Sequence, residues 1–226
     1  RLVSSAASDV YKRQIINIAN LAKKNDLFII VDEVYREFIY SDLKHFSILE
    51  DETFFDNAIL IDSTSKRYSL CGARIGFIVS KNSKFIETCM KFALARLSPP
   101  TVALIAANNA LKSDNKYIDN VIKEYSTRRK VLIGELSKIN NIEFSNPMGA
   151  FYSIIKLPVK NAEEFAKFLL TDFSINNESV MLAPAAGFYS SNDNGKDEVR
   201  IAFVLNSEKI KRAINIINIG LKEYIG

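Results

Sequence analysis

The stretch AILIDSTSK at residues 58–66 is an apolar run that ends directly in hydroxyl side chains and a lysine. A short apolar run rich in β-branched residues is typical of a strand that is buried on both faces. Two similar runs, LFIIV at residues 27–31 and RIGFIV at residues 74–79, lie on either side of it. Apolar residues at helical spacing over 15–24 precede the first run. This alternation predicts an α/β fold with a mostly parallel sheet covered by helices.

A different order of elements follows in the second half of the chain. The expected elements are helices over 101–111 and 117–139, a strand over 149–154, a helix over 162–173, a strand over 199–204 and a helix over 207–224. A long helix followed by a new strand–helix–strand pattern indicates a second domain. We therefore expect the C-terminal part of a large α/β domain at residues 15–115. A smaller α+β domain should occupy residues 116–226.

Composition and charge exclude several classes of protein. The chain has 226 residues and a net charge of +4 without a basic stripe interleaved with aromatic residues, so nucleic acid is not an expected partner. No apolar run is long enough to span a membrane. Cys71 and Cys89 lie in no metal or redox spacing, and His45 is the only histidine, so we expect no metal site. We expect the cysteines to be free thiols in the reducing cytoplasm.

The first 14 residues, RLVSSAASDVYKRQ, differ in character from the rest of the chain. They contain neither an initiator methionine nor the apolar stretch of a signal peptide. We interpret residues 1–14 as a non-native or linker segment, with a native helix start as the alternative. The fold prediction therefore excludes them.

Reactive side chains follow two of the predicted strands. Asp32 follows the first apolar run, and Ser63, Ser65 and Lys66 follow the second, with Arg74 eight residues after Lys66. Ligands of open α/β sheets collect at the carboxyl ends of the strands, so these side chains can meet in one crevice. Taken singly, a lysine after a strand is usually exposed to solvent, and an aspartate there usually caps a turn. Their order and spacing together favour a functional site.

Four segments, IIVDEVYREF, DSTSKRYSLCGARIGFIVS, PMGAFY and DEVRIAFV, resemble the class I and II aminotransferases. These are pyridoxal 5′-phosphate (PLP) enzymes of fold type I, and the resemblance runs from about residue 15 to the end. The segments LSPPT, VMLAPAAGFY and GKDEVRIAFVLN are most similar to bacterial enzymes of the aspartate aminotransferase group. The resemblance implies ping-pong transfer of an amino group between an amino acid, expected to be aspartate, and a 2-oxo acid, expected to be 2-oxoglutarate.

The resemblance also implies which residues contact the reactive parts of PLP. Lys66 would form a Schiff base with the cofactor and then act as a general acid–base. Asp32 would lie against the pyridine nitrogen and keep the ring protonated, so that the ring can act as an electron sink. Tyr35 would donate a hydrogen bond to the ring oxygen. The plainer alternative for Tyr35 is a packed aromatic side chain.

Anionic groups would be held by hydroxyl and guanidinium side chains. The resemblance assigns Ser63, Ser65 and Arg74 to the cofactor phosphate, and an arginine suits this role because its planar fork forms paired, charge-assisted hydrogen bonds. Arg200 would hold the substrate α-carboxylate by the same geometry. Without the resemblance, Arg200 would be interpreted as a surface residue at a strand start.

Several parts of the family pattern have no counterpart in the sequence. Family members have an N-terminal half with a glycine-containing phosphate loop, a stacking aromatic residue and an Asn-Pro-x-x-Pro-Thr-Gly segment. They also form homodimers that complete each active site, so we expect a homodimer for the full-length protein. We expect the chain as written not to transaminate at a useful rate. The alternatives are an inactive truncated fragment and a Walker-B-type NTPase, which would need a G-x-x-x-x-G-K-[ST] motif that the eight glycines do not supply.

Overall fold

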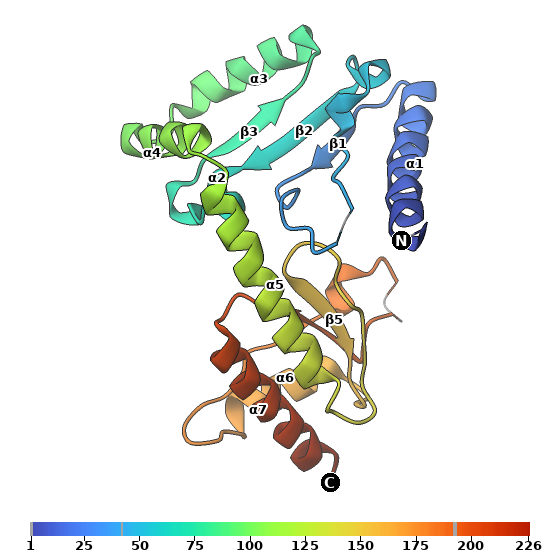
Figure 1. Ribbon diagram of the computed structural model, residues 1–226, viewed down its shortest axis with the longest axis vertical. Helices are drawn as coiled ribbons and strands as arrows, with labels where there is room; N and C mark the ends of the chain where they lie inside the picture. The colour runs from blue at the N-terminus through green and yellow to red at the C-terminus, as the bar shows by residue number, and fades with distance from the viewer. Residues whose placement is uncertain (1, 42, 192–193) are drawn as a thin grey trace. The chain divides into compact units, whose positions relative to one another are not determined.

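The computed structural model of the protein describes residues 2–41, 43–191 and 194–226. Its chain forms two compact units, Arg1–Ile122 and Lys123–Gly226, which are called the N-terminal and C-terminal units below (Figure 1). The segment interpreted as a linker is helical, because α1 spans Leu2–Lys24. Arg1 itself lies outside the described residues.

The N-terminal unit contains a three-stranded sheet of β1 (Ile29–Asp32), β2 (Ala58–Ser63) and β3 (Gly76–Val79), in that order (Figure 1). β1 runs parallel to β2, as predicted, whereas β3 runs antiparallel to β2. The connection from β2 to β3 contains only the short helices α2 (Thr64–Arg67) and η3 (Cys71–Ala73). A parallel neighbour normally needs a crossover helix, which this connection does not form.

One face of this sheet is covered by α1 and by the short helices η1 (Ile48–Glu50) and η2 (Glu52–Phe54). Ala19 of α1 forms a buried cluster there with Ile48, Phe54, Ala58 and Leu60. The sequence of β1 is typical of a strand that is buried on both faces, but in this chain its residues alternate between half-buried and exposed, and Ile30 is 66% exposed. Alternate side chains of a strand point to opposite faces, so β1 is covered on one face, whereas β2 is covered on both faces at Ala58, Ile59 and Leu60, which are all buried.

Three longer helices follow the sheet of the N-terminal unit. They are α3 (Ser83–Arg96), α4 (Thr101–Lys112) and α5 (Lys116–Leu136), and α5 continues into the C-terminal unit. The sequence predicted α4 and α5 but not α3. Asn82 caps α3 by accepting a hydrogen bond from the Phe85 amide at 3.0 Å. No residue of α3 is buried, and its large apolar side chains Met90, Phe92 and Leu94 are exposed.

The C-terminal unit is built on a four-stranded antiparallel sheet in the order β4-β5-β7-β6. The strands are β4 (Glu143–Phe144), β5 (Tyr152–Lys156), β6 (Ala183–Pro184) and β7 (Glu198–Ala202), and the helices are α6 (Ala162–Thr171) and α7 (Ser207–Ile225), with the short helix η4 (Ala186–Phe188). Leu132, Phe165, Val199 and Phe203 are fully buried in its core. β4 and β6 are too short for a periodic sequence signal.

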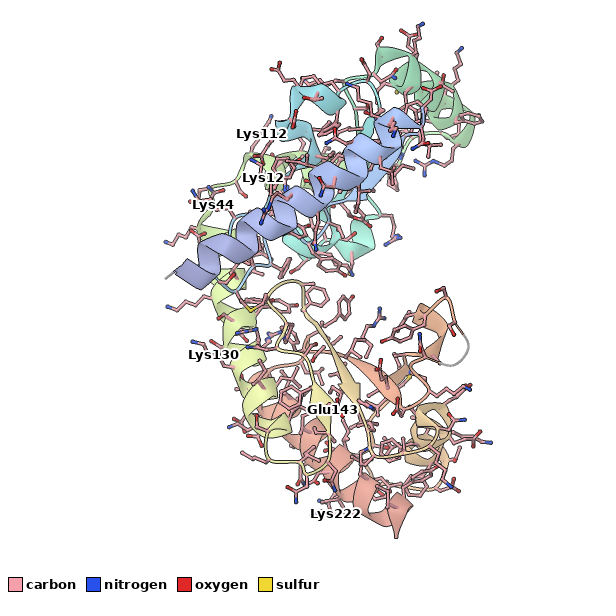
Figure 2. The ribbon with its side chains drawn as sticks, turned by 90° about the vertical axis from the view of Figure 1, so that its right-hand side faces the viewer. Lys12, Lys44, Lys112, Lys130, Glu143 and Lys222 are labelled. Carbon is pink, nitrogen blue, oxygen red and sulfur yellow. The ribbon has the colours of Figure 1, made fainter. Side chains whose placement is uncertain are left out.

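Charged side chains lie on several exposed helix faces. Lys12 of α1, Lys112 of α4, Lys130 of α5 and Lys222 of α7 are all exposed (Figure 2). Within the described residues, none of the helices has both the length and the apolar character that crossing a bilayer requires.

Candidate active site

The carboxyl ends of β1 and β2 carry two of the predicted site residues. β1 ends at Asp32, which lies opposite Ile61, and β2 ends two residues later at Ser63. Because the two strands are parallel, Asp32 and Ser63 lie at the same edge of the sheet. Lys66 lies on α2, which begins directly after β2. Ser63 and Lys66 therefore lie at the same edge of the sheet as Asp32.

The turn that holds Lys66 is fixed by Ser63. The Ser63 side chain caps α2 by accepting a hydrogen bond from the Ser65 amide at 3.0 Å. Ser63 Oγ also donates to the carbonyl of Ile75 at 3.0 Å and lies 2.8 Å from Ser65 Oγ. The two hydroxyls assigned to the phosphate are thus brought together. Lys66, between the hydroxyls and the buried Arg67, is half-buried.

Arg74 lies at the end of the connection between β2 and β3, two residues before Gly76, which pairs with Ser63. Its backbone has a φ of 56° and a ψ of 39°, a left-handed conformation that non-glycine residues adopt at a cost of about 1 kcal/mol. The guanidinium is exposed and donates to the Cys71 carbonyl at 3.0 Å. Strain of this kind persists where the surrounding structure imposes the conformation, and it is often found at ligand sites.

Asp32 and Tyr35 lie on a tight turn that follows β1. Asp32 Oδ1 accepts a hydrogen bond from the Val34 amide at 3.1 Å, which initiates the turn, and the Asp32 side chain is otherwise exposed. The Tyr35 ring packs edge-to-face on Phe38, with ring centroids 6.2 Å apart. Phe38 is 1% exposed and anchors the turn in the core. Tyr35 is therefore a packed aromatic side chain in this structure, and its hydrogen bond to the ring oxygen of the cofactor stays a prediction.

Glu33, next to Asp32, is a buried carboxylate that the sequence interpretation missed. It accepts hydrogen bonds from His45 Nε2 at 2.9 Å, Ser47 Oγ at 3.0 Å and the Ile48 amide at 3.0 Å. Burial acts to raise the pKa of Glu33, but the hydrogen bonds from His45, Ile48 and Ser47 outweigh it and hold the pKa below its ordinary value. His45 lies in a loop, as predicted. In the sequence, the only sign of its contact with Glu33 was that His45 is the single histidine of the chain.

Arg200 lies in the C-terminal unit, on β7, where it pairs with Ile154 of β5 and Ala183 of β6. Its guanidinium contacts two aromatic rings, with its carbon 4.6 Å from the centroid of Tyr152 and 4.6 Å from that of Phe188. Each cation–π contact contributes about 0.5–2 kcal/mol, depending on burial. The two rings pack against the guanidinium, and its N–H groups are the part that can bind an anion.

The residues at the sheet edge fit the chemical groups of PLP. The cofactor has a phosphate ester, an aldehyde and a ring nitrogen. The paired hydroxyls of Ser63 and Ser65, with Arg74 on the same connection, suit the phosphate. The amine of Lys66 suits the aldehyde, and the carboxylate of Asp32 suits a protonated ring nitrogen.

Solved structures of the same fold define the class of protein. The aromatic aminotransferase from Pyrococcus horikoshii superposes with a TM-score of 0.83 at 30% sequence identity, covering 95% of this chain and 56% of that chain. The α-aminoadipate aminotransferase from Thermus thermophilus, solved with N-(5′-phosphopyridoxyl)-L-leucine, has the same fold at 20% identity, with a TM-score of 0.80, 92% of this chain covered and 54% of that one. The chain therefore has part of the fold of PLP enzymes of fold type I, as predicted.

Sequence comparison identifies the family. The family model for aminotransferase class I and II matches residues 4–217, and the chain belongs to this PLP-dependent family. An aspartate aminotransferase from Pyrococcus abyssi is 31% identical over 217 residues, which cover 94% of this chain and 53% of that protein. The chain thus spans about half the length of the relatives it matches. The predicted family resemblance is confirmed, and the family assignment favours an aminotransferase over the NTPase alternative.

Proposed function

We propose that the full-length protein is a PLP-dependent aminotransferase that moves an amino group between aspartate and 2-oxoglutarate. The proposal is supported by membership of the class I and II aminotransferases and by similarity to an aspartate aminotransferase. The main observation behind the proposal is that β1 and β2 run parallel, so that Asp32, Ser63 and Lys66 follow the carboxyl ends of neighbouring strands.

Each residue at the sheet edge has a definite task in this function. Bound PLP supplies a carbonyl group for amine exchange and an electron sink. Lys66 holds the cofactor through its amine, and its Nζ then takes the proton from the substrate α-carbon and returns a proton to the product. Asp32 keeps a proton on the ring nitrogen, and Tyr35 donates a hydrogen bond from its hydroxyl to the ring oxygen. Ser63, with Ser65 and Arg74, holds the phosphate.

The substrates share a carboxylate next to the reacting carbon, and we assign its binding to Arg200. A planar fork binds a carboxylate through two parallel hydrogen bonds, which fixes the orientation of the substrate as well as its position. The rings of Tyr152 and Phe188 support this role because they restrict the rotation of the guanidinium. Arg200 would therefore bind the α-carboxylate of aspartate and that of 2-oxoglutarate in turn.

The test of the function is an assay of the purified full-length protein loaded with PLP. We expect it to form glutamate and oxaloacetate from 2-oxoglutarate and aspartate. An aromatic amino acid should be offered in parallel, because one solved relative is an aromatic aminotransferase. Faster turnover of the aromatic donor would contradict the substrate assignment, and the absence of turnover with every donor would contradict the function.

Replacing Arg200 with lysine should raise the KM for aspartate and for 2-oxoglutarate alike. Lysine keeps the charge but cannot form the paired hydrogen bonds. The lost charge-assisted bond is worth about 1.5–3 kcal/mol, which corresponds to roughly a 10- to 150-fold loss in kcat/KM. Steady-state kinetics with each substrate varied in turn would measure the change. An effect on only one of the substrates would mean that Arg200 recognises a side chain instead.

We propose that the full-length protein is a cytoplasmic homodimer. The location is supported by the two cysteines, which are free. Self-association is supported by large apolar side chains on and between α3 and α4, where Phe92 is 74%, Leu97 75% and Val102 79% exposed. Exposed apolar surface of this kind marks interaction sites in soluble proteins. Sedimentation velocity of the full-length protein would contradict the homodimer if it showed a monomer.

A further inference from the structure

Four charged side chains, Arg36, Glu37, Asp62 and Arg67, form a cluster of ion pairs in the N-terminal unit. Arg67 Nη2 donates to Asp62 Oδ2 at 2.6 Å, and Arg67 Nε lies 3.0 Å from Glu37 Oε1. Arg36 contacts the same two acids, with Nε 3.1 Å from Glu37 Oε1 and Nη1 3.9 Å from Asp62 Oδ2. Two positive and two negative charges therefore balance within the cluster.

The cluster is unusual because its centre is buried. Arg67 is 6% exposed and Asp62 is 7% exposed. The Nε of Arg67 and the Oε2 of Glu37 are both buried without an aligned hydrogen bond, so the contact between these two residues is mainly electrostatic. Burial acts to lower the pKa of Arg67, but Glu37 and Asp62 outweigh it and raise the pKa further above its usual range. Arg67 therefore stays charged.

The positions of buried charges along the chain point to a role in the site. Among the described residues, the buried ionisable side chains are Glu33, Asp62 and Arg67. Each of them is the immediate sequence neighbour of a predicted cofactor residue, namely Asp32, Ser63 and Lys66 respectively. Buried ion pairs are weak contributors to stability, because desolvation cancels most of the attraction, but they can specify one geometry. A role in positioning explains their location better than a role in stability.

The Arg67–Glu37 pair connects two segments that are far apart in the sequence. Arg67 is the last residue of α2 and follows Lys66, whereas Glu37 ends the turn that begins after Asp32 and contains Tyr35. We propose that Arg67 and Glu37 are positioning residues that fix Lys66 relative to the turn bearing Asp32 and Tyr35. This inference rests on the proposed function, because it assumes that these residues contact PLP.

The test uses two conservative variants of the full-length holoenzyme, Glu37→Gln and Arg67→Lys. Glu37→Gln keeps the shape of the side chain and removes its charge, and Arg67→Lys keeps the charge and removes the fork. Arg212→Lys is the matched control, because Arg212 forms an exposed ion pair with Glu178 at 3.4 Å in the C-terminal unit. The measurements are the pH titration of the absorbance of bound PLP, and kcat and KM for aspartate.

We expect both variants to shift the midpoint of the absorbance titration, because the amine of Lys66 meets the cofactor in a changed position. The value of kcat should fall about tenfold or more, since a misplacement of about 1 Å can cost on the order of 100-fold. The KM for aspartate should change by less than about threefold, since ground-state binding of the carboxylate is untouched. Arg212→Lys should alter none of these quantities.

The double variant Glu37→Gln/Arg67→Gln decides the question if a single variant does not fold. It leaves Arg36 and Asp62 as a balanced pair, so no unpaired charge remains buried. A shifted absorbance titration in the double variant supports the inference. Unchanged titration and kcat, with only a lower melting temperature, would overturn it in favour of a structural role. If the unaltered protein did not bind PLP through Lys66, the proposed function itself would have failed.

Discussion

Lys66→Ala is expected to remove nearly all transamination from the full-length protein. The substitution deletes the amine that holds the cofactor and moves the proton at the substrate α-carbon. A positioned general acid–base alone contributes about 10²- to 10⁴-fold to a rate, so the loss should be at least of this size. Lys44→Ala is a suitable control, because Lys44 is an exposed lysine of the same unit (Figure 2). Its activity should equal that of the unaltered protein.

The attachment of PLP to Lys66 can be tested without any activity measurement. Borohydride reduction fixes the cofactor on its lysine, and trypsin does not cleave after a modified lysine. The sequence between Lys44 and Lys66 contains no other lysine or arginine, and Arg67 follows directly. The labelled protein should therefore yield a peptide of residues 45–67 that carries the pyridoxyl group, in place of the unlabelled peptide 45–66. A pyridoxyl group on a different lysine would contradict the assignment.

The sequence predicted the order of elements in the N-terminal unit because apolar runs and turn residues are local signals. β1, β2, α4 and α5 were expected at nearly the positions where they occur, and Asp32 and Ser63 were expected at strand ends. The direction of β3 was not predictable from its own residues, because it depends on how the preceding connection folds. The exposure of Ile30 depends on which faces of the sheet are covered.

The charged contacts around the candidate site were missed for a different reason. Glu33, Glu37 and Arg67 read in the sequence as ordinary polar residues after strands, where exposure is the usual outcome. Their burial depends on partners that the fold brings from other segments: His45 for Glu33 and Arg67 for Glu37. Family resemblance identified the residues expected to contact the cofactor. It gave no information on the side chains that hold those residues in place.

Asp32→Ala should impair catalysis far more than folding. In the structure, Asp32 is exposed and accepts a hydrogen bond from the Val34 amide at 3.1 Å, so its removal should cost about 0.5–1.5 kcal/mol of stability. In the proposed function, its carboxylate keeps the ring nitrogen of PLP protonated. Loss of one preorganised electrostatic group at a reacting centre costs about 10²- to 10³-fold in rate.

The half-reaction with aspartate separates these two effects. Mixing the PLP form of each variant with excess aspartate in a single turnover reports the chemical step, while urea unfolding reports the stability. Asp56→Ala is the matched control, because Asp56 is an exposed aspartate in the loop before β2. Glu33, buried next to Asp32, is held by three hydrogen bonds from other segments and should keep the turn in place when the Asp32 side chain is removed. A single-turnover rate for Asp32→Ala within a few-fold of the unaltered protein would show that Asp32 is a turn former rather than the partner of the ring nitrogen.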